Sequence, residues 1–434
     1  MVGLIALLLS QQAQSQTNTK SPYSFYGLGD IESTAFAEGA GMGDVKYAIS
    51  NPNQINIANP AASSSLNVPV FTAGAFFNSV QTSGQGVSQA NSNAYLRYIA
   101  LAFPLGKQKR VGFGFGLTPH SKMGYSIVES QELPDLGTAD KRYIGEGGIS
   151  RAYMNFSYAI VKDSNNFVSI GATPSFYFGT INRSARVLFA GANAYNTISE
   201  NQLHVKDINA EFGINYKRRL PSKSSAKKLI SVGATYELQK EMNSENSRFV
   251  FSTSPTGFPK DTVNNQSIDG SITWPQKLGV GIAFEVSSDS IGQWLIAADY
   301  ERIDWSSFQS FDSRATLNNR QQFSIGAQYI PDGQAFRSFF KIMRYRMGAY
   351  YANTRLNVGN QQVDDLGISV GVGIPLIGSG TLDPTSSTVN ISANFGQRGA
   401  DEVGLIQERY TNIIVGFTFT PGKWDQWFKK RKIQ

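Results

Sequence analysis

The chain has 434 residues, with 39 Lys and Arg against 32 Asp and Glu, which gives a formal net charge of +7. It contains no cysteine and two histidines, which excludes disulfides, iron–sulfur clusters and cysteine nucleophiles and argues against most transition-metal enzymes. Charged residues make up 16 % of the chain, below the roughly 25 % of average soluble domains. The composition therefore predicts no cofactor and no metal.

The N-terminus has the features of a secretory signal. Leu4 to Leu9 form an apolar run, and Ala13 and Ser15 are small residues at the spacing typical of a cleavage site. The run is too short to span a bilayer as a helix. We expect residues 1–15 to be a signal peptide. The alternative is a flexible N-terminal tail of a cytoplasmic protein.

Residues 16–66 do not alternate between apolar and polar positions. They are rich in Gly, Ala and Ser and end in the triplet Asn59, Pro60 and Ala61. Small residues allow close packing in a confined space, and a wide barrel has a lumen that wall side chains alone cannot fill. We expect this segment to be an N-terminal hatch or plug inside a barrel. The alternative is a periplasmic tail.

The remainder of the chain, residues 67–420, alternates apolar with small or polar residues in windows separated by Gly, Asn, Ser, Asp or Pro clusters. In the clearest window, Val111 to Leu117, every second residue is glycine. Because the side chains of a strand alternate between its two faces, such a window has one apolar face. The pattern predicts fourteen strands, near residues 68–79, 93–104, 110–118, 147–162, 166–181, 202–219, 227–240, 271–287, 291–303, 319–330, 340–352, 364–375, 386–397 and 408–420.

An even number of segments around ten residues long is typical of a transmembrane barrel. The polar faces carry mainly Gly, Ser, Asn, Gln and Thr, whereas a soluble sheet would expose more charge. We therefore predict an all-β fold, a 14-stranded antiparallel transmembrane β-barrel. Short links such as 106–109 alternate with long ones at 119–146, 182–201 and 241–270, which predicts periplasmic turns and long extracellular loops.

Five charged side chains are predicted to face the lumen, because their strand neighbours occupy the lipid face: Arg344, Arg346, Asp299, Glu301 and Glu211. A Lys or Arg on the lipid face costs about 2–4 kcal/mol at the bilayer midplane. The simpler interpretation is a network of ion pairs that braces the wall or holds the hatch. The alternative is that Arg344 or Arg346 binds a fatty carboxylate or another anionic headgroup by a bidentate contact.

Pro174 interrupts the predicted strand 166–181. Proline removes a donor from the hydrogen-bond ladder and belongs at an edge, a bulge or a kink. We expect a bulge at Pro174. The alternative is a wall kink that acts as a lateral gate.

A hydrolase site is not predicted. His120 is expected in a long loop and His204 at the start of a strand, and the chain contains no Gly-x-Ser-x-Gly nucleophile elbow. The glycine run within residues 111–117 lacks the strand–turn–helix context of a dinucleotide site. The sequence therefore indicates that the protein is not an enzyme.

Residues 421–434 form a basic and aromatic tail, predicted to be periplasmic. Five basic residues and one acidic residue give it +4 of the net +7, so the basic balance is local and gives no case for nucleic acid. Contact with lipid headgroups or with a partner protein is expected at Trp424, Trp427, Phe428, Lys429, Lys430, Arg431 and Lys432.

The chain resembles the FadL-type outer-membrane transporters of long-chain fatty acids and other hydrophobic compounds. The resemblance rests on the secreted start, on a Gly-rich segment that ends in Asn59, Pro60 and Ala61, and on the fourteen strands that follow. The Ser21 to Asp30 start and the Trp427 to Lys432 end look like a Bacteroidetes branch. The resemblance implies a hatch that blocks the pore, an internal ligand site and a kinked strand that opens the wall.

From these observations we predict a barrel in the outer membrane of a Gram-negative bacterium that binds and admits hydrophobic small molecules such as long-chain fatty acids. Its expected partners are outer-membrane lipids and a hydrophobic ligand, without nucleic acid. The alternative is a non-transporting accessory barrel that holds other outer-membrane or periplasmic proteins in a secretion or barrel-assembly complex. A continuous apolar path from the loops to the wall favours transport, whereas a sealed lumen together with a partner-covered outer wall or tail favours the accessory role.

Overall fold

The computed structural model describes residues 21–421, apart from 85, 134–136, 190–193, 223–225, 255–256, 289, 312–316, 334, 336–337, 359–360, 377–386 and 401–404. The signal peptide predicted at residues 1–15 and all the contact residues of the predicted tail lie outside this part of the chain. The strands that form the wall are β2 Val70–Gly84, β3 Val87–Leu105, β4 Val111–Leu133, β5 Gly137–Lys162, β6 Asn166–Phe189, β7 Asn196–Leu220, β8 Lys227–Glu237, β9 Lys240–Thr253, β10 Pro259–Trp274, β11 Lys277–Ser288, β12 Gly292–Ile303, β13 Arg320–Ile330, β14 Arg344–Val358, β15 Gln361–Pro375, β16 Thr388–Arg398 and β17 Gln407–Phe419.

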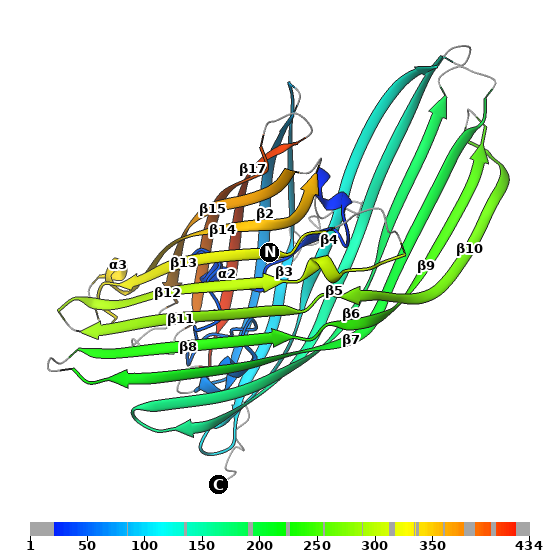
Figure 1. Cartoon of the computed structure of the whole chain (residues 1–434). Coiled ribbons are helices and arrows are strands. Elements are labelled where there is room, and N and C mark those ends of the chain that lie inside the picture. Colours follow the sequence, from blue (N-terminus) through cyan, green and yellow to red (C-terminus); the bar gives the residue numbers. More distant parts are fainter. Residues whose placement is uncertain are drawn as a thin grey trace, which may run out of the picture.

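These strands form a closed antiparallel barrel with fourteen positions around its wall (Figure 1). Two positions are each shared by a broken strand: β8 and β9 both pair with β7, and on their other side β8 pairs with β11 and β9 with β10. Pairing of β17 with β2 closes the ring. The prediction of a 14-stranded antiparallel barrel is confirmed.

The outer face of the wall is apolar, as a membrane barrel requires. Along β11, for example, every second side chain is a large exposed hydrophobic residue, and the intervening residues include two glycines. Within the described residues, no helix has both the length and the apolar character needed to cross a membrane.

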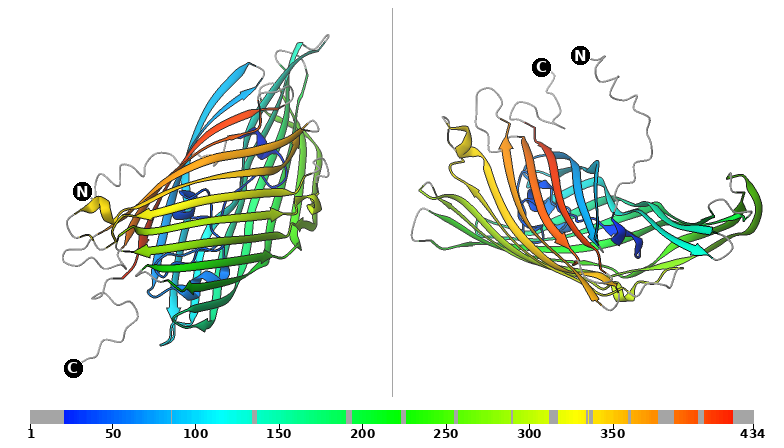
Figure 2. Two further views of the ribbon diagram at one scale, coloured as in Figure 1. Left: turned by 60° about the vertical axis from the view of Figure 1, so that its left-hand side comes forward. Right: turned by 90° about the horizontal axis from the view of Figure 1, so that it is seen from above.

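Three of the long loops expected from the sequence are instead strands. The predicted loops at 119–146, 182–201 and 241–270 lie almost entirely in β4 to β7 and in β9 and β10, and β4, β5 and β6 hold 23, 26 and 24 residues. A membrane strand needs only about 9–11 residues. The excess forms a continuous sheet beyond one end of the barrel, which we call the extended sheet (Figure 2). We call this end of the barrel the extended end.

Residues 21–66, which we call the N-terminal segment, are packed inside the wall (Figure 1). They contain η1 Pro22–Phe25, β1 Asp30–Ile31, α2 Ala37–Ala40 and η2 Pro60–Ser65. Wall glycines allow the backbone of the segment to approach closely. A Cβ atom at Gly233 would overlap the carbonyl group of Tyr47, and one at Gly348 would overlap the backbone of Met42.

Candidate functional site

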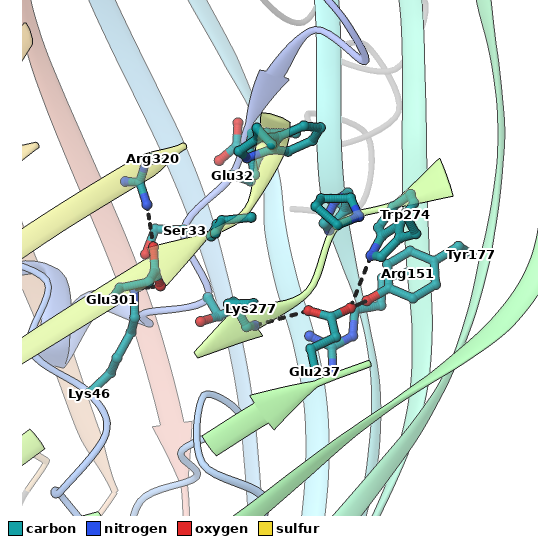
Figure 3. Close-up of a pocket in the computed structure, with 16 residues that line it drawn as sticks. Glu32, Ser33, Lys46, Arg151, Tyr177, Glu237, Trp274, Lys277, Glu301 and Arg320 are labelled. Atoms are coloured by element: carbon teal, nitrogen blue, oxygen red, sulfur yellow. Dashed lines mark hydrogen bonds and ion pairs between the residues drawn. The ribbon is translucent and has the colours of Figure 1, made fainter. Parts of the chain in front are cut away.

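The centre of the N-terminal segment is joined to the wall by a cluster of buried charges around Lys46 (Figure 3). The Lys46 ammonium lies 2.8 Å from Asp44 Oδ2 and 3.2 Å from Glu301 Oε2. Glu301 on β12 also pairs with Arg320 on β13 and accepts a hydrogen bond from the Tyr47 hydroxyl. Burial alone would lower the pKa of Lys46, but Asp44 and Glu301 raise it above its usual value.

Asp299, two residues before Glu301, binds the backbone of the same segment. Its Oδ2 accepts hydrogen bonds from the amides of Lys46 at 2.5 Å and Tyr47 at 2.9 Å. Both predicted inward carboxylates of β12 therefore hold the N-terminal segment.

Glu211 on β7 lies in a second cluster on the neighbouring part of the wall. Figure 3 shows three other members of this cluster, Arg151, Glu237 and Lys277. The Glu211 carboxylate is 2.9 Å from Lys277 Nζ and 3.3 Å from Arg151 Nη2. Lys277 also pairs with Glu237 at 3.2 Å, and Glu237 accepts a hydrogen bond from the Tyr177 hydroxyl at 2.8 Å. These groups lie next to the two strand breaks, where β8 ends and β11 begins.

Arg344 and Arg346 are placed differently. Arg346 is 4 % exposed and donates to the side-chain oxygens of Gln328 at 2.8 Å and Asn390 at 2.9 Å. Among the described residues neither arginine forms an ion pair, and Arg344 Nη1 and Arg346 Nη2 are buried without a hydrogen-bond partner. The two arginines thus lie apart from the carboxylates with which they were grouped in the sequence analysis.

The part of the N-terminal segment next to the extended end of the barrel is also held by charges. Glu32 lies 3.4 Å from both Arg97 Nη1 on β3 and Lys122 Nζ on β4. Burial would raise the pKa of Glu32, but the two cations lower it below its usual value. At the rim, Arg398 on β16 pairs with Asp30 at 2.9 Å and with Glu408 at 2.6 Å.

The triplet Asn59, Pro60 and Ala61 starts η2 and contacts the wall. The Asn59 side chain accepts a hydrogen bond from Ala61 N at 3.0 Å and donates to the carbonyls of Tyr47 at 2.7 Å and Ile214 at 3.1 Å. The carbonyl of Pro60 accepts from Asn155 of β5 at 2.9 Å. The triplet is therefore a joint between the N-terminal segment and the barrel.

Replacing Asn59 with Ala should lower the free energy of unfolding by about 1–3 kcal/mol, because the cap is lost and buried carbonyls lose their donor. The measurement is the denaturant midpoint of the protein in detergent. Asn51→Ala is the control, because Asn51 Oδ1 accepts from Asn53 N within the same segment. Equal midpoints for the two variants would contradict the assignment of Asn59 as a joint.

Pro174 lies in β6 without shifting its register. It is the register partner of Ala210 on β7, and on the β5 side the pairs Tyr153–Ser175 and Phe156–Ala172 keep the same register across it. The expected bulge at Pro174 is therefore not found. The wall is interrupted instead at Pro275, between β10 and β11, and at residues 238–239, between β8 and β9.

The prediction that His120 lies in a loop is wrong. His120 lies within β4, at a register shift between Pro119 and Ser121. Its ring packs against Trp274, with centroids 4.6 Å apart, and against Tyr177 at 5.1 Å. Alternation stops at this bulge, which is why the sequence pattern ended the strand too early.

Four cavities between the N-terminal segment and the wall are small or polar, and a fifth is an apolar groove of about 300 Å³ beside η1, at the tips of β4 and β5. One, at the charge clusters, holds about 50 Å³, and two others hold about 60 Å³ and 10 Å³. A fourth, of about 200 Å³, is lined by charged groups that include Asp30, Asp365, Arg97 and Arg398. Ligand pockets for hydrophobic molecules are usually apolar and about 300–1,000 Å³.

The sequence analysis missed the basic partners of the predicted carboxylates, namely Lys46, Arg151, Lys277 and Arg320. Arg151 and Lys277 are inward-facing by strand alternation and could have been found in that way. Lys46 had no such signal, because it lies in the non-alternating N-terminal segment.

The fold is similar to solved outer-membrane barrels. The toluene transporter TodX of P. putida aligns with a TM-score of 0.57 and 16 % identity, covering 90 % of this chain and 99 % of that one. A Pseudomonas aeruginosa FadL homologue gives 0.56 and 12 %, covering 90 % and 99 %. The Ralstonia pickettii toluene transporter TbuX gives 0.55 and 14 %, covering 89 % and 98 %. At these identities the likeness establishes the barrel fold.

No curated protein sequence matches the chain. One family model does, and its match runs from residue 1 to residue 434. Since this match covers the whole chain, the protein belongs to the BamG family.

Proposed function

We propose that the protein is a non-transporting accessory barrel of the outer membrane, which holds partner proteins in a secretion or barrel-assembly complex. The observation that carries this proposal is the way the lumen is filled. The N-terminal segment acts as a hatch that is joined to β3, β4, β7, β12 and β16 by charges or hydrogen bonds along its length.

Such a lumen is a poor route for a hydrophobic compound. Moving an apolar molecule through it would break ion pairs at Lys46 and Glu301, whose side chains are 5 % and 9 % exposed. Separating buried charges without new partners is costly. The extended sheet supports the same role, because it projects well beyond the length that a membrane strand needs (Figure 2). The family name, BamG, is in keeping with a barrel-assembly complex.

In this proposal the chain is exported by its N-terminal signal, and the basic aromatic tail lies in the periplasm beside headgroups or a partner.

A second candidate is uptake of a hydrophobic compound, as the resemblance to FadL-type transporters implies. An apolar groove of about 300 Å³ at the extended end of the barrel favours it. Toluene transport by TodX and TbuX, which share the fold, is consistent with it. In that case Arg344 or Arg346 is the candidate partner for a fatty carboxylate.

The test is native mass spectrometry of the protein extracted from its own outer membrane without overexpression. The accessory role predicts recovery in a defined complex with other envelope proteins and no bound hydrophobic compound. A lone barrel with a stoichiometric hydrophobic molecule would contradict it and support transport.

A further inference from the structure

One edge of the extended sheet, on β4, is open. β3 pairs with β4 only from Ile99–Leu117 to Leu105–Val111. Within the described residues, the part of β3 that precedes Ile99 pairs with β2 alone. Figure 1 shows the β2–β3 hairpin and β4 separating, with the N-terminal segment between them. Among the described residues, the tip of β4 from Ser126 to Leu133 pairs with β5 alone. We call this stretch the open edge.

The base of this edge already accepts a strand. β1 pairs with β4 through Asp30–Lys122 and Ile31–Ser121. Glu32 N donates to the carbonyl of His120 at 2.9 Å on the same side. The N-terminal segment then leaves the ladder at Gly29, where φ is +86° and a Cβ atom would overlap the carbonyl of Lys122.

Beyond β1, one backbone amide of the edge is satisfied by a side chain. Gly124 N donates to Ser24 Oγ at 3.1 Å. Alternate residues of a strand direct their backbone groups to the same side. The residues whose N–H and C=O groups are therefore directed to the open edge are Ser126, Val128, Ser130 and Glu132.

The apolar groove lies beside this edge. Its lining comes from η1, from β4 and β5, and from the rim of the barrel, and includes Phe25, Ile127, Tyr143 and Ile406. Ile127 and Tyr143 are register partners, so the groove begins at the open edge. Phe25 is 41 % exposed and Ile127 is 37 % exposed, which leaves the groove accessible.

We infer that an extended segment of a partner protein adds to the open edge of β4 and places an aromatic or branched aliphatic side chain in the apolar groove. The inference rests on the proposed accessory function and names the surface that serves it. The unpaired N–H and C=O groups of the open edge bind an extended strand, and the apolar lining of the groove binds an apolar side chain of that strand. Such a strand continues the ladder that β1 begins, in which Ile31 already packs against the neighbouring apolar core.

The experiment uses the full-length protein in its native outer membrane, with the photoreactive residue p-benzoylphenylalanine replacing Phe25. Irradiation should give one main cross-linked protein, with the link mapped by mass spectrometry to an extended segment that has an apolar side chain at the cross-link. Two further variants then test the groove and the edge separately.

Ile127→Asp places a charge in the groove, and Val128→Asp is its control on the opposite face of β4. Ser130→Pro removes an amide directed to the open edge without removing a backbone β4–β5 hydrogen bond. Ser130→Ala is its control, because both variants lose the hydrogen bond from Ser130 Oγ to Asp140 on β5. Ile127→Asp and Ser130→Pro should each lower the cross-link yield by about tenfold or more, as loss of a central contact does. The controls should stay within about twofold of the unmodified protein.

Two outcomes would overturn the inference. One is an unchanged yield in both Ile127→Asp and Ser130→Pro while the complex is still recovered by native mass spectrometry, which leaves the accessory function standing. The other is a cross-link to lipid, to a small hydrophobic molecule or to a second copy of this chain. Absence of any complex from the unmodified protein would instead contradict the proposed function itself.

Discussion

Reversing the charge of Lys46 should turn a closed barrel into a conducting one. Lys46→Glu brings a fourth carboxylate next to Asp44, Asp299 and Glu301, in a place where the Lys46 side chain is 5 % exposed. Removing one partner of a buried ion pair costs about 3–5 kcal/mol, and a like charge adds repulsion. The centre of the N-terminal segment should then detach from β12, leaving a water-filled lumen.

The measurement is the conductance of single barrels in planar bilayers, where the unmodified protein should remain closed. Lys46→Met removes the charge but not the bulk, and its channels should open less often than those of Lys46→Glu. The double variant Lys46→Glu with Glu301→Lys restores an opposite pair and should close the barrel again in part. A Lys46→Glu protein that stays closed would show that these ion pairs do not hold the segment in the lumen.

The barrel could be predicted because apolar and polar residues alternate along the sequence of a membrane strand. A strand between lipid and lumen must alternate, and β11 does so from Lys277 to Phe284. The extended sheet shows no such alternation. In β10, for example, nearly all residues are exposed on both faces and most are polar. The sequence pattern therefore ended several strands close to the membrane boundary and treated their tips as loops.

The charged residues of the site could be predicted in part for a similar reason. Glu211, Asp299 and Glu301 face inward by alternation, and burial of each follows from that rule. Their partners could not be assigned, because pairing depends on which parts of the N-terminal segment meet which strands. Lys46 and Glu301 are 255 positions apart, and no local pattern relates them.

Removal of Glu211 should produce a large loss of stability. Its side chain is 1 % exposed and neutralises both Lys277 and Arg151, whose side chains are 10 % and 3 % exposed. In Glu211→Ala, the carboxylate of Glu237 alone must neutralise both Lys277 and Arg151. We expect the free energy of unfolding to fall by about 3–5 kcal/mol, because a positive charge is left buried and unpaired.

The check is the denaturant midpoint in detergent, followed by the mobility difference between folded and heated protein on a gel. Lys240→Ala is the matched control, since Lys240 pairs with Asp207 at 2.7 Å but its side chain is 39 % exposed. Such a pair contributes at most about 1 kcal/mol, so its loss should move the midpoint little. If Glu211→Ala and Lys240→Ala shifted the midpoint equally, the ion pairs of Glu211 with Lys277 and Arg151 would not be a main source of the barrel's stability.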